Sequence, residues 1–487
     1  DLRGKLVLLD FWTYCCINCL HVLEDLKYLE EKYAHRPLAV IGVHSPKFTN
    51  EDDPASVRQA IARNGITHPV LLDSKRRTWD AYGVRGWPTL VLLDPRGYVL
   101  GRVSGEGNRA RLDAAIEQAL DLLGQAEALD STPLPIKLEA ESGAFSPASP
   151  LLYPGKVLAD EATNSLFIAD TGHHRIVRAD LDGTHYVTMG DGESGATDGD
   201  YATARFRSPQ GMALDAAHNC LYVADTGNHL VRRIDLDAQT VTTVAGTGEQ
   251  GLHRTEGGPA LSTPLNSPWD ICLLENRLYI AMAGSHQIWV YHPSNETVAV
   301  FAGSGAERRT DGTATQAAFA QPSGVTTDGV RLYIADSEIS CVREIDLAGP
   351  EPKVRTLAGG DLFQFGDHDG RGDMARMQHP LDVAWVPVGA PGGGTLYVAD
   401  TYNHKLRRLD AATRDLSSFC GKAPAGFEDG PPLVARFREP SGLSYAHRRL
   451  YVADTNNSAI RVVKLPEGTV STLALPELCA PGICLPG

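Results

Sequence analysis

A four-residue motif recurs six times after residue 160, and this repetition restricts the possible folds more than any other feature of the chain. The copies read FIAD, YVAD, YIAM, YIAD, YVAD and YVAD, and they end at Asp170, Asp225, Met282, Asp336, Asp400 and Asp454. Successive copies lie 55, 57, 54, 64 and 54 residues apart. Each unit holds about four short alternating runs separated by Gly, Pro or Asp, which is typical of a propeller blade. The sequence therefore predicts a six-bladed all-β propeller over residues 151–476.

Within each unit the motif has the period of a strand. Because side chains alternate between the two faces of a strand, we expect the aromatic residue and Ala to point one way and Val or Ile and Asp the other. The terminal Asp suits a turn in which its carboxylate accepts backbone N–H bonds. The third and fourth units depart at Met282 and at Ser337-Glu338-Ile339, so we expect those two turns to be held differently.

The residues that follow the motif resemble the NHL repeat family. They are Asn228-His229-Leu230, Asn403-His404-Lys405 and the weaker Asn457-Ser458. Some propellers of this family are metal-dependent lyases, and His173-His174 near Asp170 is one of several His and Asp pairs that suggest metal ligands. Because the His recurs as part of the repeat, we favour a structural role in the turn over a metal site.

The first part of the chain alternates strands and helices instead. Apolar runs predict strands at Lys5–Trp12, Leu38–Val43, His68–Leu72 and Thr89–Leu93, with Tyr98–Ser104 as a hairpin partner. Periodicity predicts helices at Cys16–Tyr33, Ala55–Asn64, Lys75–Tyr82 and Arg109–Leu123. Strand and helix alternation with a terminal hairpin indicates a mixed α/β sheet covered on both faces, here over residues 1–124.

The remaining segments and the charge restrict the class of protein further. Residues 125–150 are rich in Pro, Ser, Ala and Glu, which predicts a linker, and residues 477–487 form a tail with two cysteines.

A net charge of −15 argues against nucleic acid as a partner, and no run approaches the roughly 18 apolar residues of a membrane helix. Because the chain begins at Asp1 rather than Met, we expect that its N-terminus is incomplete.

A CxxC pair at the start of the first helix carries the chemistry. The sequence FWTYCCINC ends with Cys16-Ile17-Asn18-Cys19, where an apolar strand gives way to a helix. The unpaired N–H groups and the positive end of the helix dipole favour the thiolate of Cys16. Cys19, one turn later, is placed to attack a mixed disulfide on Cys16. A CxxC alone also fits half of a zinc site or a structural thiol pair.

Two distant features favour the redox interpretation. Asp10 ends the buried strand, where a carboxylate is costly unless it has a role. Trp87-Pro88-Thr89 leads from a loop into a strand, which makes the Trp87–Pro88 bond a candidate cis peptide.

These segments resemble the two halves of a thioredoxin active site. LVLLDFWTYCCINC and YGVRGWPTLVLLDPRG look most like the TlpA/redoxin branch, with its extra helix and strand at about Phe48–Asp73. The resemblance implies that Cys16 attacks, Cys19 resolves and Asp10 assists deprotonation of Cys19. It also implies that Pro88 is the cis-proline, beside which the neighbouring backbone, with Trp87 and Thr89, grips an extended substrate. With the propeller, the whole chain is similar to NHL-repeat proteins that carry an N-terminal thioredoxin-like domain.

The chain departs from that pattern around the pair. Cys15 replaces the usual aromatic residue, and Ile17-Asn18 replaces Gly-Pro or Pro-Pro, a dipeptide that tunes the redox potential. The cluster of three thiols also suggests that Cys15 could form a disulfide with another molecule. In the tail, Cys479 and Cys484 suggest either a mobile redox relay or, more simply, a disulfide at the end of the chain.

We therefore expect a thiol–disulfide oxidoreductase whose propeller recruits a protein partner or substrate, bound in part at the cleft between the domains. It would need no cofactor and no metal beyond the dithiol and an external thiol or disulfide partner. The alternative is a non-catalytic or redox-sensing interaction scaffold. Four single cysteines in strand-like settings, at Cys220, Cys272, Cys341 and Cys420, suggest buried reduced thiols and a cytoplasmic location.

Overall fold

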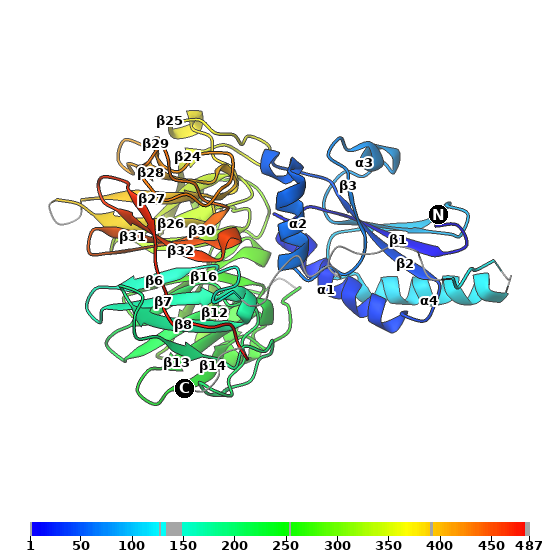
Figure 1. The fold of residues 1–487 in the computed structure, drawn as a ribbon, viewed down its shortest axis with the longest axis horizontal. Coiled ribbons are helices and arrows are strands. Elements are labelled where there is room, and N and C mark those ends of the chain that lie inside the picture. The colour runs from blue at the N-terminus through cyan, green and yellow to red at the C-terminus, as the bar shows by residue number, and fades with distance from the viewer. Residues whose placement is uncertain (1, 126–127, 133–148, 253–254, 390–392, 483–487) are drawn as a thin grey trace. The chain divides into compact units, whose positions relative to one another are not determined.

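The chain divides into two compact units, residues 1–146 and 147–487, shown in Figure 1. The computed structural model describes residues 2–125, 128–132, 149–252, 255–389 and 393–482. Most of the predicted linker at 125–150, together with Cys484, lies outside the described residues.

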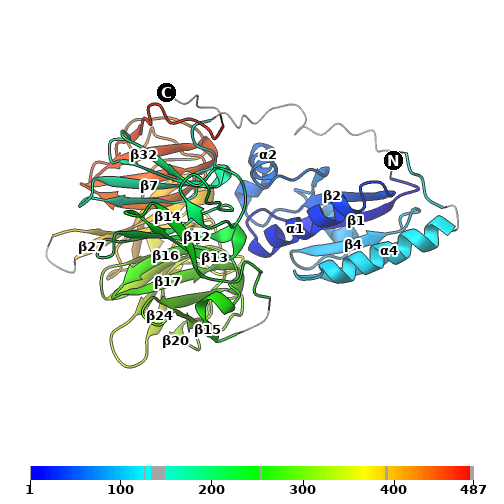
Figure 2. The same cartoon turned by 90° about the horizontal axis from the view of Figure 1, so that it is seen from below.

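The first unit is the predicted mixed sheet with helices on both faces. Its strand order is β3-β2-β1-β4-β5, with β1 parallel to β2 and antiparallel to β4. The helices α1 and α4 lie on one face of the sheet and α3 on the other (Figures 1 and 2). The elements are β1 (Leu6–Trp12), α1 (Ile17–Lys32), β2 (Leu38–His44), α2 (Pro54–Arg63), β3 (Val70–Leu72), α3 (Arg77–Ala81), β4 (Thr89–Leu93), β5 (Val99–Ser104) and α4 (Arg109–Gln125).

Strand β1 is buried along its whole length, as its apolar sequence predicts. On one face Val7, Leu9 and Phe11 pack in a core with Trp79 of α3. Asp10 is the single charged residue of the strand and points to the opposite face, where α1 lies. The strand thus places the Asp10 carboxylate beneath the helix that begins with the CxxC pair.

The second unit is a six-bladed propeller, as predicted. Each blade is an antiparallel sheet of four consecutive strands, and in blades two to five a short preceding strand adds to the outer edge. Blades one to three contain β6 (Val157–Asp160), β7 (Ser165–Asp170), β8 (Arg175–Asp180) and β9 (Val187–Met189), then β10 (Gly199–Asp200), β11 (Met212–Asp215), β12 (Cys220–Asp225), β13 (Leu230–Asp235) and β14 (Thr240–Ala245), then β15 (Gly257–Pro259), β16 (Pro268–Leu274), β17 (Arg277–Met282), β18 (Gln287–His292) and β19 (Thr297–Ala302). Blades four to six contain β20 (Gly312–Thr313), β21 (Pro322–Thr327), β22 (Arg331–Asp336), β23 (Cys341–Asp346) and β24 (Lys353–Gly359), then β25 (Gly370–Arg371), β26 (Asp382–Pro387), β27 (Gly394–Asp400), β28 (Lys405–Leu409) and β29 (Asp415–Cys420), then β30 (Pro440–Ala446), β31 (Arg449–Asp454), β32 (Ala459–Lys464) and β33 (Val470–Thr472).

The hydrophobic cores of the propeller lie between neighbouring blades. In the YVAD strand of blade two, Tyr222 and Ala224 face the core shared with blade three, whereas Leu221 and Val223 face the core shared with blade one. This confirms the predicted alternation of the motif. Blade six packs on blade one in the same way, so the ring closes by packing of two complete sheets, without exchange of a strand.

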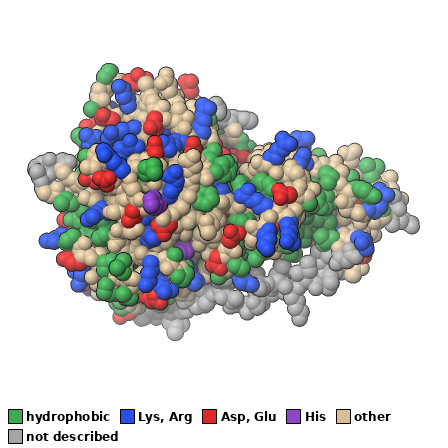
Figure 3. Space-filling model, turned by 90° about the horizontal axis from the view of Figure 1, so that it is seen from above, with side chains coloured by type: hydrophobic (Ala, Val, Ile, Leu, Met, Phe, Trp, Pro, Cys, Tyr) green, Lys and Arg blue, Asp and Glu red, His purple; other side chains and the backbone are tan. Residues whose placement is uncertain are grey.

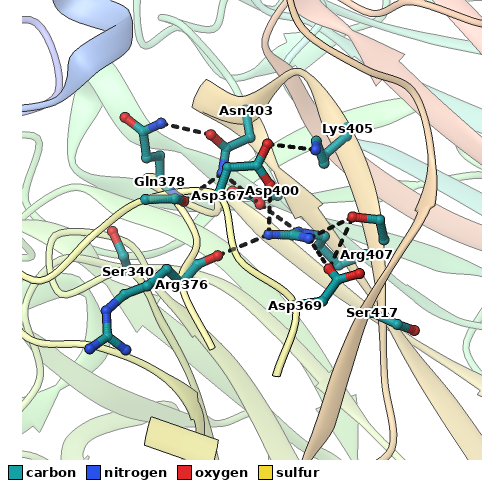
Figure 4. A network of polar contacts seen from close by, with 12 residues as sticks. Ser340, Asp367, Asp369, Arg376, Gln378, Asp400, Asn403, Lys405, Arg407 and Ser417 are labelled. Atoms are coloured by element: carbon teal, nitrogen blue, oxygen red, sulfur yellow. Dashed lines mark hydrogen bonds and ion pairs between the residues drawn. The ribbon is translucent and has the colours of Figure 1, made fainter. Parts of the chain in front are cut away.

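The terminal Asp of the motif accepts bonds from both its turn and a buried arginine, as Figure 4 shows for blade five. Asp400 Oδ1 accepts the N–H of Gln378 at 2.8 Å, and Oδ2 accepts from Asn403 Nδ2 and Arg407 Nε, both at 2.8 Å. Arg407 is fully buried. The same pairing of aspartate and arginine holds blades two, four and six through Asp225 with Arg232, Asp336 with Arg343, and Asp454 with Arg461.

The third and fourth blades depart from the others at the places predicted. In blade three, Met282 and Trp289 occupy the positions of the aspartate and the arginine and pack together in an apolar core. Replacing both members of a buried ion pair by apolar residues avoids the cost of desolvating two charges. In blade four, Asp336 and Arg343 keep the ion pair, and only the intervening turn changes.

The His of the repeat links each blade to the next. His229 Nδ1 accepts the backbone N–H of Ser267 at 3.0 Å, and His174, His286 and His404 accept in the same way from Ser208, Gln321 and Glu439. In the other two blades a serine Oγ replaces the ring nitrogen, since Ser340 accepts from His379 N–H and Ser458 accepts from Tyr153 N–H. The recurring His therefore has a structural role, as we predict from its recurrence in the repeat.

A buried charge cluster lies where the innermost strands converge. Lys156 of blade one is within 3.0 Å of Asp382 Oδ1 in blade five and 3.4 Å of Asp270 Oδ2 in blade three. The three intervening blades have glycine at this position, namely Gly211, Gly324 and Gly442. A Cβ at Gly211 would lie 2.1 Å from Asp270 Oδ1, so alternation of glycine with charged residues makes room for the cluster.

Candidate active site

The two cysteines of the CxxC pair occupy the first turn of α1. Cys16 is the N-cap residue, in extended conformation, and is partly exposed, whereas Cys19 is fully buried. Cys19 N–H donates to Cys16 O at 3.0 Å, which closes the first turn of the helix on the pair. The pair therefore has one sulfur that a substrate can reach and one held behind it.

Asp10 lies beneath this pair on β1. Its side chain is fully buried, and neither carboxylate oxygen has a hydrogen-bond partner among the described residues. Burial raises the pKa of Asp10 to about 7, an effect that the charge of His68 opposes. Burial also raises the pKa of the Cys19 thiol well above its usual value, and Cys16 and the negative charge of Asp10 add to this rise. A thiol in this position needs a nearby base to lose its proton, and Asp10 is suited to be that base.

The second predicted half of the site, Trp87-Pro88-Thr89, lies at the start of β4. The Trp87–Pro88 peptide is cis, as predicted. Thr89 lies opposite Phe11 in the antiparallel register, so Pro88 reaches the sheet at the end of β1 from which the CxxC loop leaves. Trp87 Nε1 donates to Ser45 O at 2.9 Å, and Thr89 Oγ1 lies 2.9 Å from Ser104 Oγ. These bonds fix the loop that would border a substrate.

Cys15 points into the protein. It is 2% exposed, and its Sγ lies 3.9 Å from Thr13 Oγ1. Its backbone N–H donates to Glu51 Oε1 at 3.1 Å. Burial of this sulfur disfavours the disulfide with another molecule that the sequence suggests as an option for Cys15.

Glu51 is a residue of this site that sequence analysis missed. It lies in a short 3₁₀ turn, Thr49–Asp52, and is 1% exposed. Besides Cys15, its carboxylate accepts from Lys47 N–H at 2.7 Å and Phe48 N–H at 2.9 Å. A carboxylate with three backbone donors is well stabilised in the interior and ties the loop before α2 to the CxxC loop. The acidic stretch around Glu51 gave no signal that distinguished it.

A packed group of rings supports the same loop. His44, at the end of β2, stacks on Tyr14 with ring centroids 5.5 Å apart and meets Trp12 edge to face at 5.1 Å. Burial lowers the pKa of His44 to about 3, so the ring is neutral at physiological pH. His44 therefore acts as an aromatic packing residue behind Tyr14.

The C-terminal tail packs on the propeller as far as it is described. Cys479 is disulfide-bonded, and its carbonyl accepts from Arg175 Nη2 of β8 at 2.9 Å. Cys484, the other half of the predicted relay, lies outside the described residues. A redox relay between this tail and Cys16 stays a prediction.

Neither a metal cluster nor a membrane span is found in the described part of the chain. Within it, no three His, Cys, Asp or Glu side chains form a group that could hold a metal ion. None of its helices combines the length and apolarity needed to cross a membrane. On the face shown in Figure 3, basic and acidic side chains are intermixed. The cytoplasmic location stays a prediction.

Comparison with known proteins supports both halves of this description. A thioredoxin-like family model matches residues 4–99, and an NHL repeat model matches residues 206–234 and 265–291. The chain is 41% identical over 508 residues to NHL repeat-containing protein 2 of Homo sapiens, covering 98% of this chain and 68% of that protein. The chain belongs to this family. It shares both the thioredoxin-like domain and the NHL repeats with its relatives.

Two further relatives indicate how far the likeness extends. Protein SUPPRESSOR OF QUENCHING 1, chloroplastic, of Arabidopsis thaliana is 45% identical over 491 residues, which is 98% of this chain and 46% of that protein. The chain therefore spans about half of the length of that relative. The thiol-disulfide oxidoreductase ResA of Bacillus anthracis is 26% identical over 118 residues, which is 24% of this chain and 65% of ResA. The N-terminal unit is thus related to thiol–disulfide oxidoreductases.

Proposed function

We propose that the N-terminal unit is a thiol–disulfide oxidoreductase and that the NHL propeller recruits its protein partner or substrate. The observation that carries the redox part is the pairing of a partly exposed Cys16 with a fully buried Cys19 above the buried Asp10. The distant likeness to ResA supports the same chemistry.

The first step uses Cys16, since it is the sulfur that solvent reaches. Its thiolate attacks one sulfur of a substrate disulfide, a mixed disulfide forms, and the other substrate sulfur leaves as a thiolate. Cys16 is the N-cap residue of α1, and the positive end of a helix dipole favours negative charge at that position.

The second step uses Cys19 and Asp10. The Cys19 thiol gives its proton to the carboxylate of Asp10, and the resulting thiolate attacks Cys16 Sγ. The Cys16–Cys19 disulfide forms, and the second substrate sulfur leaves as a thiolate. Because burial raises the pKa of both Cys19 and Asp10, the base holds the proton near neutral pH rather than releasing it at once. An external dithiol then reduces the disulfide and completes the cycle.

The backbone beside Pro88 would bind the extended chain of a protein substrate. Trp87 is held to Ser45 by its indole N–H, and Thr89 is held through its hydroxyl, so this edge is preformed. Recruitment of the partner is assigned to the propeller, because six blades offer a broad, rigid surface for binding.

The test is an insulin-reduction assay with dithiothreitol on the full chain and on Cys16→Ser and Cys19→Ser. We expect turnover by the wild type, no turnover by Cys16→Ser, and a trapped mixed disulfide in Cys19→Ser. Cys272→Ser, in the propeller, is the matched control and should behave as the wild type. Equal and negligible rates for all four proteins would contradict the oxidoreductase function and leave a non-catalytic interaction scaffold.

A further inference from the structure

Two buried nitrogen atoms converge on a space beside Asp10. Asp10 on β1 is paired with Gly42 on β2 in the parallel register, so both residues face α1. A Cβ built on Gly42 would lie 3.0 Å from Trp12 Nε1 and 3.3 Å from His68 Nε2. The missing side chain of Gly42 is therefore what leaves room for both nitrogens next to the carboxylate.

These atoms are polar groups whose hydrogen bonds the fold does not otherwise satisfy. Within the described residues, both oxygens of Asp10, Trp12 Nε1 and His68 Nε2 are buried and have no hydrogen-bond partner. Buried polar atoms in native proteins are paired directly or through an ordered water. Four such atoms therefore lie on one side of the sheet, near Gly42, between Asp10 and His68.

The other nitrogen of His68 leads toward solvent. His68 Nδ1 lies 3.2 Å from Glu30 Oε2, and Glu30 is on α1. The His68 side chain is 3% exposed, whereas the Glu30 side chain is 26% exposed. An imidazole can take up a proton on one nitrogen and release one from the other. His68 is therefore oriented to transfer protons between the buried carboxylate of Asp10 and the accessible carboxylate of Glu30.

We propose that His68 and Glu30 form a proton relay that connects Asp10 with solvent during the resolving step. The proposal rests on the oxidoreductase function proposed above. His68 acts through Asp10 and not on the substrate, so it is a positioning residue and not a catalytic one.

The proton path balances with the disulfide chemistry. Asp10 receives the proton of Cys19 as the Cys16–Cys19 bond forms and the bond from Cys16 to the substrate sulfur breaks, with the electron pair leaving on that sulfur. Protonated Asp10 passes a proton by way of an ordered water to His68 Nε2, while the Nδ1 proton moves to the Glu30 carboxylate. Glu30 releases it to water, and Asp10 returns to its charged form. When the external dithiol reduces the pair, the same path supplies the proton that Cys19 regains.

The charges around Asp10 suit this role. Among the residues that the structure describes, the ionisable groups that face it are Cys19, with Cys16 behind it, at the start of α1, and His68 in the loop before β3. Burial raises the pKa of Asp10 to about 7, and the charge of His68 limits this rise. A carboxyl group whose pKa is near 7 gains and loses its proton easily at neutral pH.

The test follows the two phases of the reaction of the reduced full chain with Ellman's reagent by stopped flow. The first thionitrobenzoate leaves when Cys16 attacks, and the second leaves when Cys19 attacks Cys16. For His68→Gln we expect an unchanged first phase, a second phase about tenfold slower at pH 7, and a higher pH midpoint of the second phase. Glu30→Gln should slow the second phase in the same direction. His35→Gln and Glu31→Gln, at exposed positions, are the matched controls and should match the wild type.

A second variant and a second readout keep the outcome decisive. Gly42→Ala keeps His68 and Glu30 but places a methyl group 3.3 Å from His68 Nε2, so it displaces this nitrogen and should reproduce the slow second phase. The pKa of Asp10, read from the carboxyl infrared band that Asp10→Asn removes, should rise in His68→Gln. An unchanged second phase together with an unchanged Asp10 pKa in His68→Gln would overturn the relay while the oxidoreductase function stands. A wild type that releases no second thionitrobenzoate would instead overturn the oxidoreductase function, and the relay with it.

Discussion

Lys156 of the first propeller blade lies 3.0 Å from Asp382 of the fifth blade, although 226 positions separate them in the chain. Both side chains are buried, and Asp270 of the third blade completes the cluster. Each carboxylate also accepts backbone bonds from the next blade, Asp270 from Val325 N–H and Asp382 from Leu443 N–H. One lysine thus ties three alternate blades together, and its two aspartates hold two of the intervening ones.

Lys156→Met should destabilise the propeller by about 3–5 kcal/mol at pH 8, because it leaves two buried carboxylates without their cation. The loss should be smaller at pH 5, where Asp382, whose pKa burial raises to about 7, is neutral. Urea unfolding at both pH values measures this. Lys353→Met, at an exposed position, is the control, and equal losses for the two variants would contradict the role of the cluster.

His229→Ala should weaken the contact between blades two and three, because the buried N–H of Ser267 loses its acceptor, at a cost of about 1–3 kcal/mol. His229→Ser should lose less, since blades four and six use serine at this position. Hydrogen exchange of the peptide containing Ser267 measures both. His218→Ala, whose side chain is 65% exposed, should leave that exchange rate unchanged. Protection of Ser267 in His229→Ala equal to that of the wild type would refute the link.

Asp400 and Arg407 should show strong energetic coupling, since both are fully buried, whereas Asp367 and Asp369, the other carboxylates that pair with Arg407, are exposed. Arg407→Met alone should cost about 3–5 kcal/mol, because it leaves a buried charge unpaired. The double variant Asp400→Asn/Arg407→Met should cost less than the sum of the two single variants. Urea unfolding of the four proteins completes the cycle, with Arg408→Met as an exposed control. Additive losses would show that the pair is not a unit.

Much of this molecule follows from periodicity. The spacing of the YVAD copies predicts the number of blades, and the apolar run of β1 predicts a buried strand in which Asp10 stands out. The CxxC pair, Asp10 and Pro88 were identified because each breaks a local pattern, as a thiol at a helix start, a charge in a buried strand or a proline entering a strand. Such breaks are visible without a structure.

Residues whose roles come from tertiary contacts could not be found in this way. Glu51 lies in an acidic stretch, and His68 stands at the start of a predicted strand that the structure begins two residues later, at Val70, so neither departs from its local surroundings in the sequence. Their partners, Cys15 and Glu30, are 36 and 38 positions away. The alternation of glycine with Lys156, Asp270 and Asp382 is visible in the repeat, but its meaning requires knowing that the six positions meet near one axis.

Glu51→Gln should loosen the CxxC loop. The amide has one oxygen, so at least one of the three backbone donors, those of Cys15, Lys47 and Phe48, would face an NH₂ group instead of an acceptor. We expect a loss of about 2–3 kcal/mol in the stability of the N-terminal unit and faster alkylation of Cys15, which is 2% exposed in the native fold. Mass spectrometry after timed iodoacetamide treatment measures the alkylation. Glu31→Gln, on the exposed face of α1, is the control, and unchanged labelling of Cys15 in Glu51→Gln would show that the carboxylate does not hold this loop.

Asp10→Asn should stabilise the N-terminal unit at alkaline pH and have little effect in acid. Burial raises the pKa of Asp10 from 3.8 to about 7, so the folded state binds its proton more tightly than the unfolded state does. The stability that this proton provides is fully present below about pH 4 and is lost as the pH rises through 7. A shift of roughly three pKa units corresponds to a difference on the order of 4 kcal/mol above pH 8. Pulsed hydrogen exchange in urea, read on peptides of β1 between pH 5 and 8.5, measures the unfolding of this unit separately from the propeller. Asp80→Asn, at an exposed position, should show no such trend, and a constant difference between Asp10→Asn and wild type across this range would mean that Asp10 is charged in the folded protein throughout.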